Sequence, residues 1–149
     1  MKEELKEELK VINLEDYYSE DNEREGVWAS PEDIDVDCPF EFLLTGANDP
    51  RNVAYAERYS KKLDELEDIK DLEEKAEKRK DLDAERIADF VQGMRPKTGY
   101  KLTVGKEDFV YSKPYIIKFF RKSPLIQNWA FRFVYKTANF IGRKKNSLN

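Results

Sequence analysis

The large apolar side chains of this chain are concentrated in one stretch, residues 84–143, and this uneven distribution limits where a core can form. The stretch begins with an amphipathic segment, AERIADFVQGM, and continues after a break at RPKTGYKLTVG into KEDFVYSKPYIIKFFRKS and PLIQNWAFRFVYKTANFIG. Burial of apolar surface drives folding, and no other part of the chain has comparable apolar volume. We therefore expect the fold to be built on this stretch. Its aromatic residues include Phe90, Tyr100, Phe109, Tyr111, Tyr115, Phe119, Phe120, Trp129, Phe131, Phe133, Tyr135 and Phe140.

The last two segments predict a pair of helices, over about 107–121 and 124–141. Ser123-Pro124 sets the boundary between them, because Ser can cap a helix and Pro suits its first position. Pro114 falls early in the first helix and favours a start near Ser112. Apolar residues recur at steps of three, four and seven, the spacing of a buried helical face. These residues are Ile116, Phe119, Phe120, Leu125, Ile126, Trp129, Ala130, Phe133 and Phe140.

Two short segments, GVWAS at 26–30 and FEFLL at 40–44, are the β-like part of the sequence. Both are bulky and lie near turn residues, and FEFL alternates so that Phe40 and Phe42 share a face. We predict two strands of a small antiparallel sheet, joined by the acidic loop EDIDVDC, with YKLTV at 100–104 as a third strand or a turn. Two strands are barely stable alone, so they must pack on a helix.

An Asn-Asp-Pro sequence at 48–50 is a strong helix start, since Asn or Asp caps the free amides and Pro suits the first helical position. No further Gly or Pro occurs until Gly93, where we expect a helix to end. Nineteen of the twenty-six residues at 61–86 are charged, which leaves a thin apolar stripe. The pattern predicts one long solvated helix or a helical hairpin with a turn near 80–81. The stripe, through which another copy could pair, consists of Tyr55, Tyr59, Leu63, Leu66, Ile69, Leu72 and Ala76.

Residues 1–12 are predicted to form a short helix, with Leu5, Leu9 and Ile12 at helical spacing, and residues 13–25 an acidic, mobile connector. The chain as a whole is predicted to be α+β and mainly α-helical, with a small N-terminal antiparallel sheet and a C-terminal helical cluster. We divide it into an N-terminal helix and connector at 1–25 and one α+β domain at 26–149. That domain comprises a sheet at 26–46, a charged helix or helical hairpin at 49–92 and a helical pair at 106–142.

Charge is divided unevenly along the chain. The net charge is −4, but residues 101–149 carry +9 and residues 1–100 therefore carry −13. Such a distribution can fold on itself or present two faces to partners. The N-terminus lacks the apolar core of a secretory signal, and no run approaches the roughly 18 apolar residues of a membrane span. With one cysteine, these features predict a soluble protein of a reducing cytoplasm.

The sequence contains no recognisable catalytic signature. Histidine is absent, which removes the commonest general base and the commonest metal ligand. Asp33, Asp35 and Asp37 alternate, but they lack the glycine and the distal glutamate of a calcium loop. Cys38 has no histidine in the chain to activate its thiol. No glycine loop for phosphate is present. We therefore expect no enzymatic activity, no small-molecule substrate, no metal and no cofactor.

The basic C-terminal part interleaves cations with aromatic rings, and three interpretations remain open. If the rings form the core, the cations form an outer face that the acidic part of the chain balances. If the rings are exposed, they could stack on nucleic-acid bases while cations neutralise phosphates. An acidic protein partner is the third possibility. The recurrence of apolar residues at helical spacing favours the core, and the low overall hydropathy argues against a membrane-surface helix.

Residues 48–141 show a layout that resembles the tail assembly chaperones of long-tailed bacteriophages. TGANDPRNVAYAERYSKKL corresponds to the family's turn and first helix, and RIADFVQGMRPKTGYKL to its middle segment. KPYIIKFFRKSPLIQNWAFRFVYKTANFI corresponds to the closing helical pair. The chain departs from the family pattern at Met94, where a tryptophan is common.

The resemblance implies a non-enzymatic chaperone in the host cytoplasm that keeps the tape measure protein soluble during tail assembly and then yields to tail tube subunits. A chaperone for apolar helices needs a groove of apolar surface and a charged exterior. We expect Trp129 and Phe131, on different sides of one helix, to divide between core and client surface. Two rival functions are a structural tail or connector subunit retained in the virion and a small nucleic-acid-binding protein. The candidate partner-binding residues are Tyr111, Tyr115, Trp129, Phe131 and Tyr135.

Overall fold

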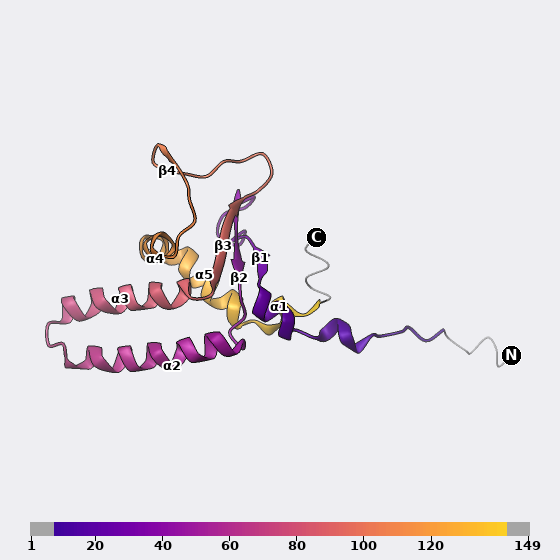
Figure 1. The fold of residues 1–149 in the computed structure, drawn as a ribbon, viewed down its shortest axis with the longest axis horizontal. Helices are drawn as coiled ribbons and strands as arrows, with labels where there is room; N and C mark the ends of the chain where they lie inside the picture. The colour runs from indigo at the N-terminus through magenta and orange to yellow at the C-terminus, as the bar shows by residue number, and fades with distance from the viewer. Residues whose placement is uncertain (1–7, 143–149) are drawn as a thin grey trace.

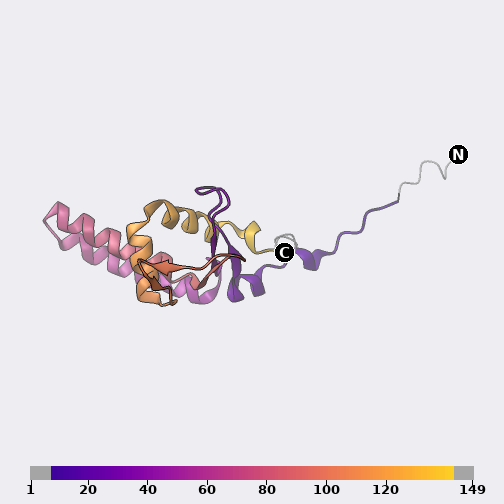
Figure 2. The same ribbon diagram turned by 90° about the horizontal axis from the view of Figure 1, so that it is seen from above.

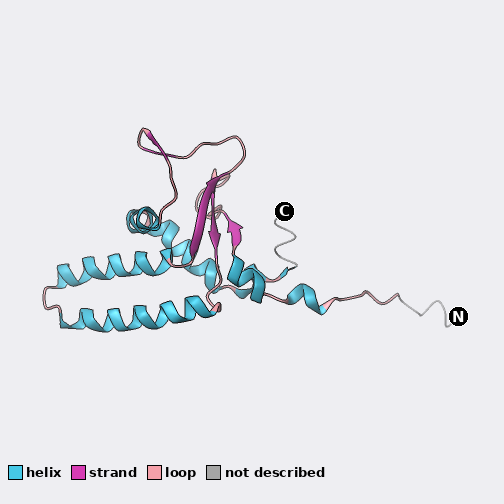
Figure 3. Cartoon of the chain, viewed as in Figure 1, coloured by secondary structure: helices cyan, strands magenta, loops and turns pink. Residues whose placement is uncertain are grey.

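The protein, in a computed structural model that describes residues 8–142, has a small antiparallel sheet at its centre with helices packed around it (Figures 1 and 3). A long helical hairpin projects from one side of the sheet, and the N-terminal residues extend from the opposite side (Figures 1 and 2). The predicted α+β class, mainly helical with a small antiparallel sheet, is confirmed.

The sheet has the order β1-β2-β3, with strands β1 (Val27–Ala29), β2 (Phe40–Leu44) and β3 (Val91–Pro96). The first two strands fall where the alternation predicted them. The third strand is β3, which pairs with β2. The segment at 100–104, predicted as a third strand or a turn, contributes only β4 (Thr103–Val104) to a separate hairpin with β5 (Glu107–Asp108). The segment QGMR lacks a β pattern and becomes a strand because β2 offers it a free edge.

Two antiparallel helices, α2 (Pro50–Glu65) and α3 (Leu72–Ala88), form the hairpin. Of the two alternatives for this region, the helical hairpin is therefore correct. The predicted turn near 80–81 is wrong, because the chain reverses through η3 (Leu66–Asp68) and Asp71, whose side chain caps α3. The predicted helix end at Gly93 is also wrong: α3 ends at Ala88, and Gly93 lies in β3.

The C-terminal part forms α4 (Lys113–Lys122), α5 (Pro124–Tyr135) and the short η4 (Thr137–Phe140). The first helix starts at Lys113, as Pro114 indicated, rather than at 107, and the Ser112 hydroxyl accepts the Tyr115 N–H at 3.2 Å. Pro124 begins the next helix as predicted, although the Ser123 side chain makes no capping hydrogen bond. The predicted extension of that helix to 141 is wrong, because the chain leaves α-helical geometry at Lys136.

The core lies between the sheet and the helices α3, α4 and α5. Phe42 of β2 is fully buried, and its ring lies 5.5 Å from the ring of Phe120 and 6.2 Å from that of Trp129. Most of the predicted apolar face is buried or partly buried here, but Leu125 is 69% exposed and does not belong to it. The buried apolar cluster consists of Ala29, Phe42, Leu44, Ala84, Ile87, Ala88, Phe90, Val91, Ile116, Phe120, Trp129, Ala130 and Val134.

The predicted connector at 13–25 is folded onto the body. It contains η2 (Leu14–Tyr17) and α1 (Glu20–Glu25), and the Asn22 amide donates to the Phe140 carbonyl at 2.8 Å. The Gly46 N–H in turn donates to the Glu23 backbone carbonyl at 2.8 Å. Hydrogen bonds to backbone groups of distant segments therefore hold α1 on the body. The predicted helix at 1–12 begins outside the described residues, and its described part, 8–12, has no regular structure.

The acidic and basic parts of the chain meet inside one molecule. Arg121 of α4 pairs with Asp81 of α3 at 2.8 Å and with Glu77 of the same helix. Lys113 at the start of α4 pairs with Asp89 at the end of α3. Basic residues of α4 therefore form ion pairs with acidic residues in and just after α3 in the same molecule.

Candidate functional site

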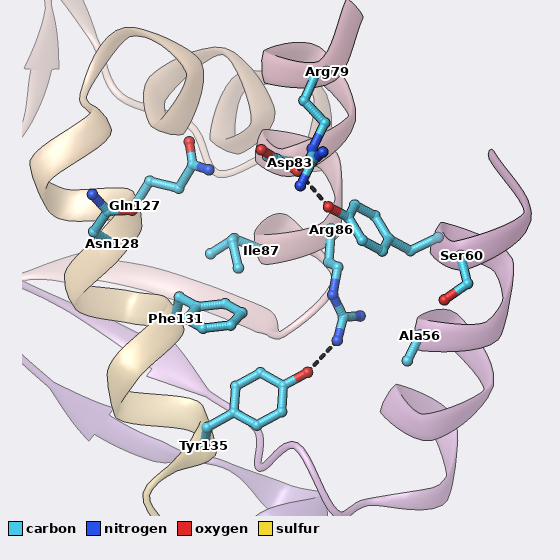
Figure 4. A pocket seen from close by; sticks show the side chains of 11 residues that line it. Ala56, Ser60, Arg79, Asp83, Arg86, Ile87, Gln127, Asn128, Phe131 and Tyr135 are labelled. Atoms are coloured by element: carbon cyan, nitrogen blue, oxygen red, sulfur yellow. Dashed lines mark hydrogen bonds and ion pairs between the residues drawn. The ribbon is translucent and has the colours of Figure 1, made fainter. Parts of the chain in front are cut away.

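The candidate site is a groove of about 450 Å³ between the helical hairpin and α5 (Figure 4). Helices α2 and α3 form one side, and α5 forms the other. The hairpin extends beyond the sheet and α5 on one side of the molecule (Figures 1 and 2). The groove is lined by Ala56, Tyr59, Ser60, Arg79, Asp83, Arg86, Ile87, Gln127, Asn128, Phe131 and Tyr135.

The hairpin side of the groove is held together by polar contacts. The Tyr59 hydroxyl of α2 donates to the Asp83 carboxylate of α3 at 2.6 Å. Arg79, one turn before Asp83, donates to the same oxygen at 3.2 Å. Burial raises the pKa of the Tyr59 hydroxyl above its ordinary value, and the bond to Asp83 raises it further. Asp83, the acid that lines the groove, is thus occupied by two donors from the protein itself.

The α5 side of the groove carries an aromatic pair, Phe131 and Tyr135. Residues four apart lie on one helical face, and these two rings are 4.8 Å apart with their planes inclined by 42°. Phe131 remains 45% exposed and Tyr135 48% exposed. Two large rings therefore offer apolar surface to a ligand while supporting each other.

At the base of the groove lies Arg86, which is only 9% exposed. One guanidinium nitrogen, Nη2, donates to the Tyr135 hydroxyl, and the guanidinium carbon lies 5.1 Å from the centre of the Tyr59 ring (Figure 4). The terminal nitrogen Nη1 is buried and has no hydrogen-bond partner among residues 8–142. Within residues 8–142 no carboxylate forms an ion pair with this cation. Rings and a phenol, and no carboxylate of the described chain, thus surround this cation, so its positive charge favours an anion in the groove.

The Tyr135 hydroxyl is a second hydrogen-bond donor in the groove, on a side chain that is about half exposed. Its oxygen accepts from Arg86, so its hydrogen must be donated elsewhere, and no protein acceptor in the described chain receives it. The groove thus combines an apolar aromatic pair with adjacent donors, an arrangement suited to an apolar side chain next to a carboxylate. Within the described part of the chain, no group of three Cys, Asp or Glu residues is placed to hold a metal ion.

The five predicted partner-binding residues divide into three places. Phe131 and Tyr135 line the groove. Trp129 faces the other way and is 6% exposed, with its ring 5.6 Å from that of Phe133, so it belongs to the core. Tyr111 and Tyr115 lie near the start of α4, away from the groove. The structure thus brings two of the five residues together.

Tyr111 and Tyr115 are held by contacts of their own. The Tyr111 hydroxyl donates to the Val91 carbonyl at 3.0 Å, and burial raises the pKa of this hydroxyl. The Tyr115 ring packs edge-on against Phe109 at 5.6 Å. Both side chains fix the loop between β5 and α4 to the body, which accounts for their positions without a partner.

Sequence reasoning missed the hairpin side of the groove. Tyr59 was part of the thin apolar stripe, but Arg79, Asp83 and Arg86 belonged to a run of charges that the pattern assigned to solvent. A signal was present in the alternative of a helical hairpin: two antiparallel helices bring the tyrosines of the first beside the residues near 83–87 of the second. The residues that face each other could be identified only from the position of the turn, and the turn at 66–71 contains neither Gly nor Pro to mark it.

None of the helices in residues 8–142 combines the length and the apolar character that a bilayer crossing requires. Comparisons of the chain with protein-family models, with curated proteins and with solved structures found no match.

Proposed function

We propose that this protein is a non-enzymatic tail assembly chaperone that holds a helical segment of a tape measure protein in the groove between α2, α3 and α5. The observation that carries the proposal is the half-exposed pair Phe131 and Tyr135 on the open side of that groove. An amphipathic helix binds such a surface by inserting apolar side chains spaced by three or four residues. A volume of about 450 Å³ suits a few side chains of a helix that lies along the surface.

The charged exterior supports the same function. The hairpin buries few of its side chains and carries twelve of the thirty-one acidic residues, so it would keep a complex with an apolar client in solution. The resemblance over residues 48–141 supplies the identity of the client. The proposal places the protein in the host cytoplasm during assembly, where tail tube subunits would displace it.

The two rival functions receive less support. Nucleic-acid binding needs free cations beside exposed rings, but Arg121 and Lys113 are paired with acids of the same chain and most rings of α4 and α5 are in the core. A subunit retained in the virion would also need a protein-binding surface. It would differ from a chaperone by its presence in the finished particle.

Co-expression tests the proposal directly. The tape measure protein of the same phage is produced alone and with this chain, and its soluble fraction is measured. We expect the wild-type chain to keep the client soluble and the Phe131→Ala variant to bind it roughly five- to thirtyfold more weakly, as for truncation of an aromatic interface anchor. Tyr100→Ala is the matched control, because Tyr100 is 59% exposed in the loop between β3 and β4 and does not line the groove.

Two results would overturn this function. If the client stays insoluble with the wild-type chain, the chain is not its chaperone. If Phe131→Ala and Tyr100→Ala weaken binding equally, the groove is not where the client binds. Purified virions that contain the chain in stoichiometric amounts would favour the rival structural role.

A further inference from the structure

The residues that precede η2 expose an unusual amount of apolar surface. We define the N-terminal arm as residues 1–13, of which 8–13 are described. Leu9 is 90% exposed, Val11 94% and Ile12 69%. Apolar side chains scattered singly on a surface are ordinary, but several within four consecutive positions mark a segment that is covered in a complex.

The arm points away from its own groove. The described part runs outward from the body, away from the sheet and from the hairpin of α2 and α3 (Figures 1 and 2). Its root is fixed, because the Tyr18 carbonyl accepts the Gly142 N–H at 3.1 Å. An arm anchored in this direction meets a second molecule more readily than the groove of its own chain.

The sequence of the arm complements the groove in apolar character and in charge. In a helical conformation Leu5, Leu9 and Ile12 form one apolar stripe, and Glu4 and Glu8 border it. The groove offers the ring of Phe131 for such a stripe. It also offers a cation, Arg86, without a carboxylate partner in the described chain, and a Tyr135 hydroxyl whose hydrogen has no acceptor there.

We propose that the N-terminal arm of a second copy of this chain docks in the groove, with its apolar stripe on Phe131 and a glutamate facing Tyr135 and Arg86. Residues 8–12 are not helical in the single chain, so the arm folds as it binds. Because every copy has one arm and one groove, exchange between two copies gives a closed dimer. The inference concerns the same groove as the proposed client but does not depend on that client, and the two occupants would compete.

The test uses the full-length chain and measures mass against concentration by sedimentation equilibrium. We expect the wild type to shift from monomer to dimer as concentration rises. Leu9→Asp with Ile12→Asp in the arm, and Phe131→Ala in the groove, should each weaken association by at least about tenfold. The matched control is Val36→Asp, since Val36 is an apolar side chain 81% exposed in a loop outside the arm, and it should leave association unchanged.

A mixture of the two defective variants tests directly whether the arm of one copy binds the groove of another. The Phe131→Ala chain keeps its arm, and the Leu9→Asp, Ile12→Asp chain keeps its groove. A mixture should therefore form a 1:1 complex at concentrations where each variant alone is monomeric. Absence of this complex overturns the proposal, as does a wild type that is monomeric at all concentrations or a dimer that both variants leave intact. None of these measurements contains a client, so failure of the proposed chaperone function would not alter them.

Discussion

The division of α5 between core and groove makes a quantitative prediction about Trp129 and Phe131. These side chains are two positions apart on one helix and are both large and aromatic. Trp129 is 6% exposed among the rings of the core, and truncation of such a residue to alanine costs about 3–5 kcal/mol. Phe131 keeps 45% of its surface in water, so its truncation to alanine should lose only about half of the free energy gained by burying a whole phenylalanine side chain. With the loss of its contact to Tyr135, we expect about 1–1.5 kcal/mol for Phe131→Ala.

Urea unfolding followed by circular dichroism at the helical minimum measures both free energies without relying on tryptophan fluorescence. For a slope of about 2 kcal/mol per molar urea, Trp129→Ala should lower the midpoint by about 1.5–2.5 M and Phe131→Ala by about 0.6 M. Trp129→Phe, which retains a ring, provides an intermediate case that remains folded if the alanine variant does not. Client binding by the Phe131→Ala variant should fall although most of its stability remains.

Equal losses of free energy for the two alanine variants would refute this reasoning. That result would mean that Phe131 is buried in solution and that the groove is closed. A larger loss for Phe131→Ala than for Trp129→Ala would mean that α5 is rotated relative to the described structure.

Three further predictions concern the elements that position the groove. Asp49→Ala removes the side chain that accepts the Arg51 N–H at the start of α2, and thermal or urea unfolding should show a loss of about 1 kcal/mol; no loss would mean that the cap is dispensable. Gly46→Ala places a Cβ 2.4 Å from the Glu23 side chain, so we expect a loss of about 1–3 kcal/mol, and an unchanged midpoint would contradict the close packing of α1. Tyr59 has a raised pKa in the folded state, so above about pH 10 the folded state binds more protons than the unfolded state and stability falls as pH rises. The stability of the Tyr59→Phe variant should fall less steeply over that range, and identical slopes would show that burial and the bond to Asp83 do not raise the pKa of Tyr59 in the folded state.

Local signals predicted those elements whose boundaries are marked by their own residues. The alternation of FEFLL located β2, and an Asp followed by Pro located the start of α2. Pro124 located the start of α5. In each case the information lies within a few residues, because capping, proline geometry and strand alternation are local effects.

The elements that were misplaced depend on contacts between distant residues. Strand β3 has a Gly and a Pro and no alternation, yet it pairs with β2 across about fifty residues of intervening chain. The connector at 13–25 is fixed by Asn22 and Glu23, whose partners are Phe140 and Gly46. The same limitation applies to the groove: Phe131 and Tyr135 carry an aromatic signal, whereas Arg86 acquires its environment only from the packing of three helices.

Arg86 is also the strongest physical argument that the groove is a binding surface rather than a packing defect. A buried cation without a carboxylate destabilises a fold, and an apolar residue of similar length at this position would pack against the same rings without that penalty. Its Nη2 donates to the Tyr135 hydroxyl, and its Nη1 has no partner in the described part of the chain. If the cation serves an acidic occupant, Arg86→Met should leave the free energy of unfolding unchanged or raise it and at the same time weaken binding of the arm or the client. If instead Arg86→Met lowers stability by several kcal/mol while binding is unaffected, the cation has a purely structural role.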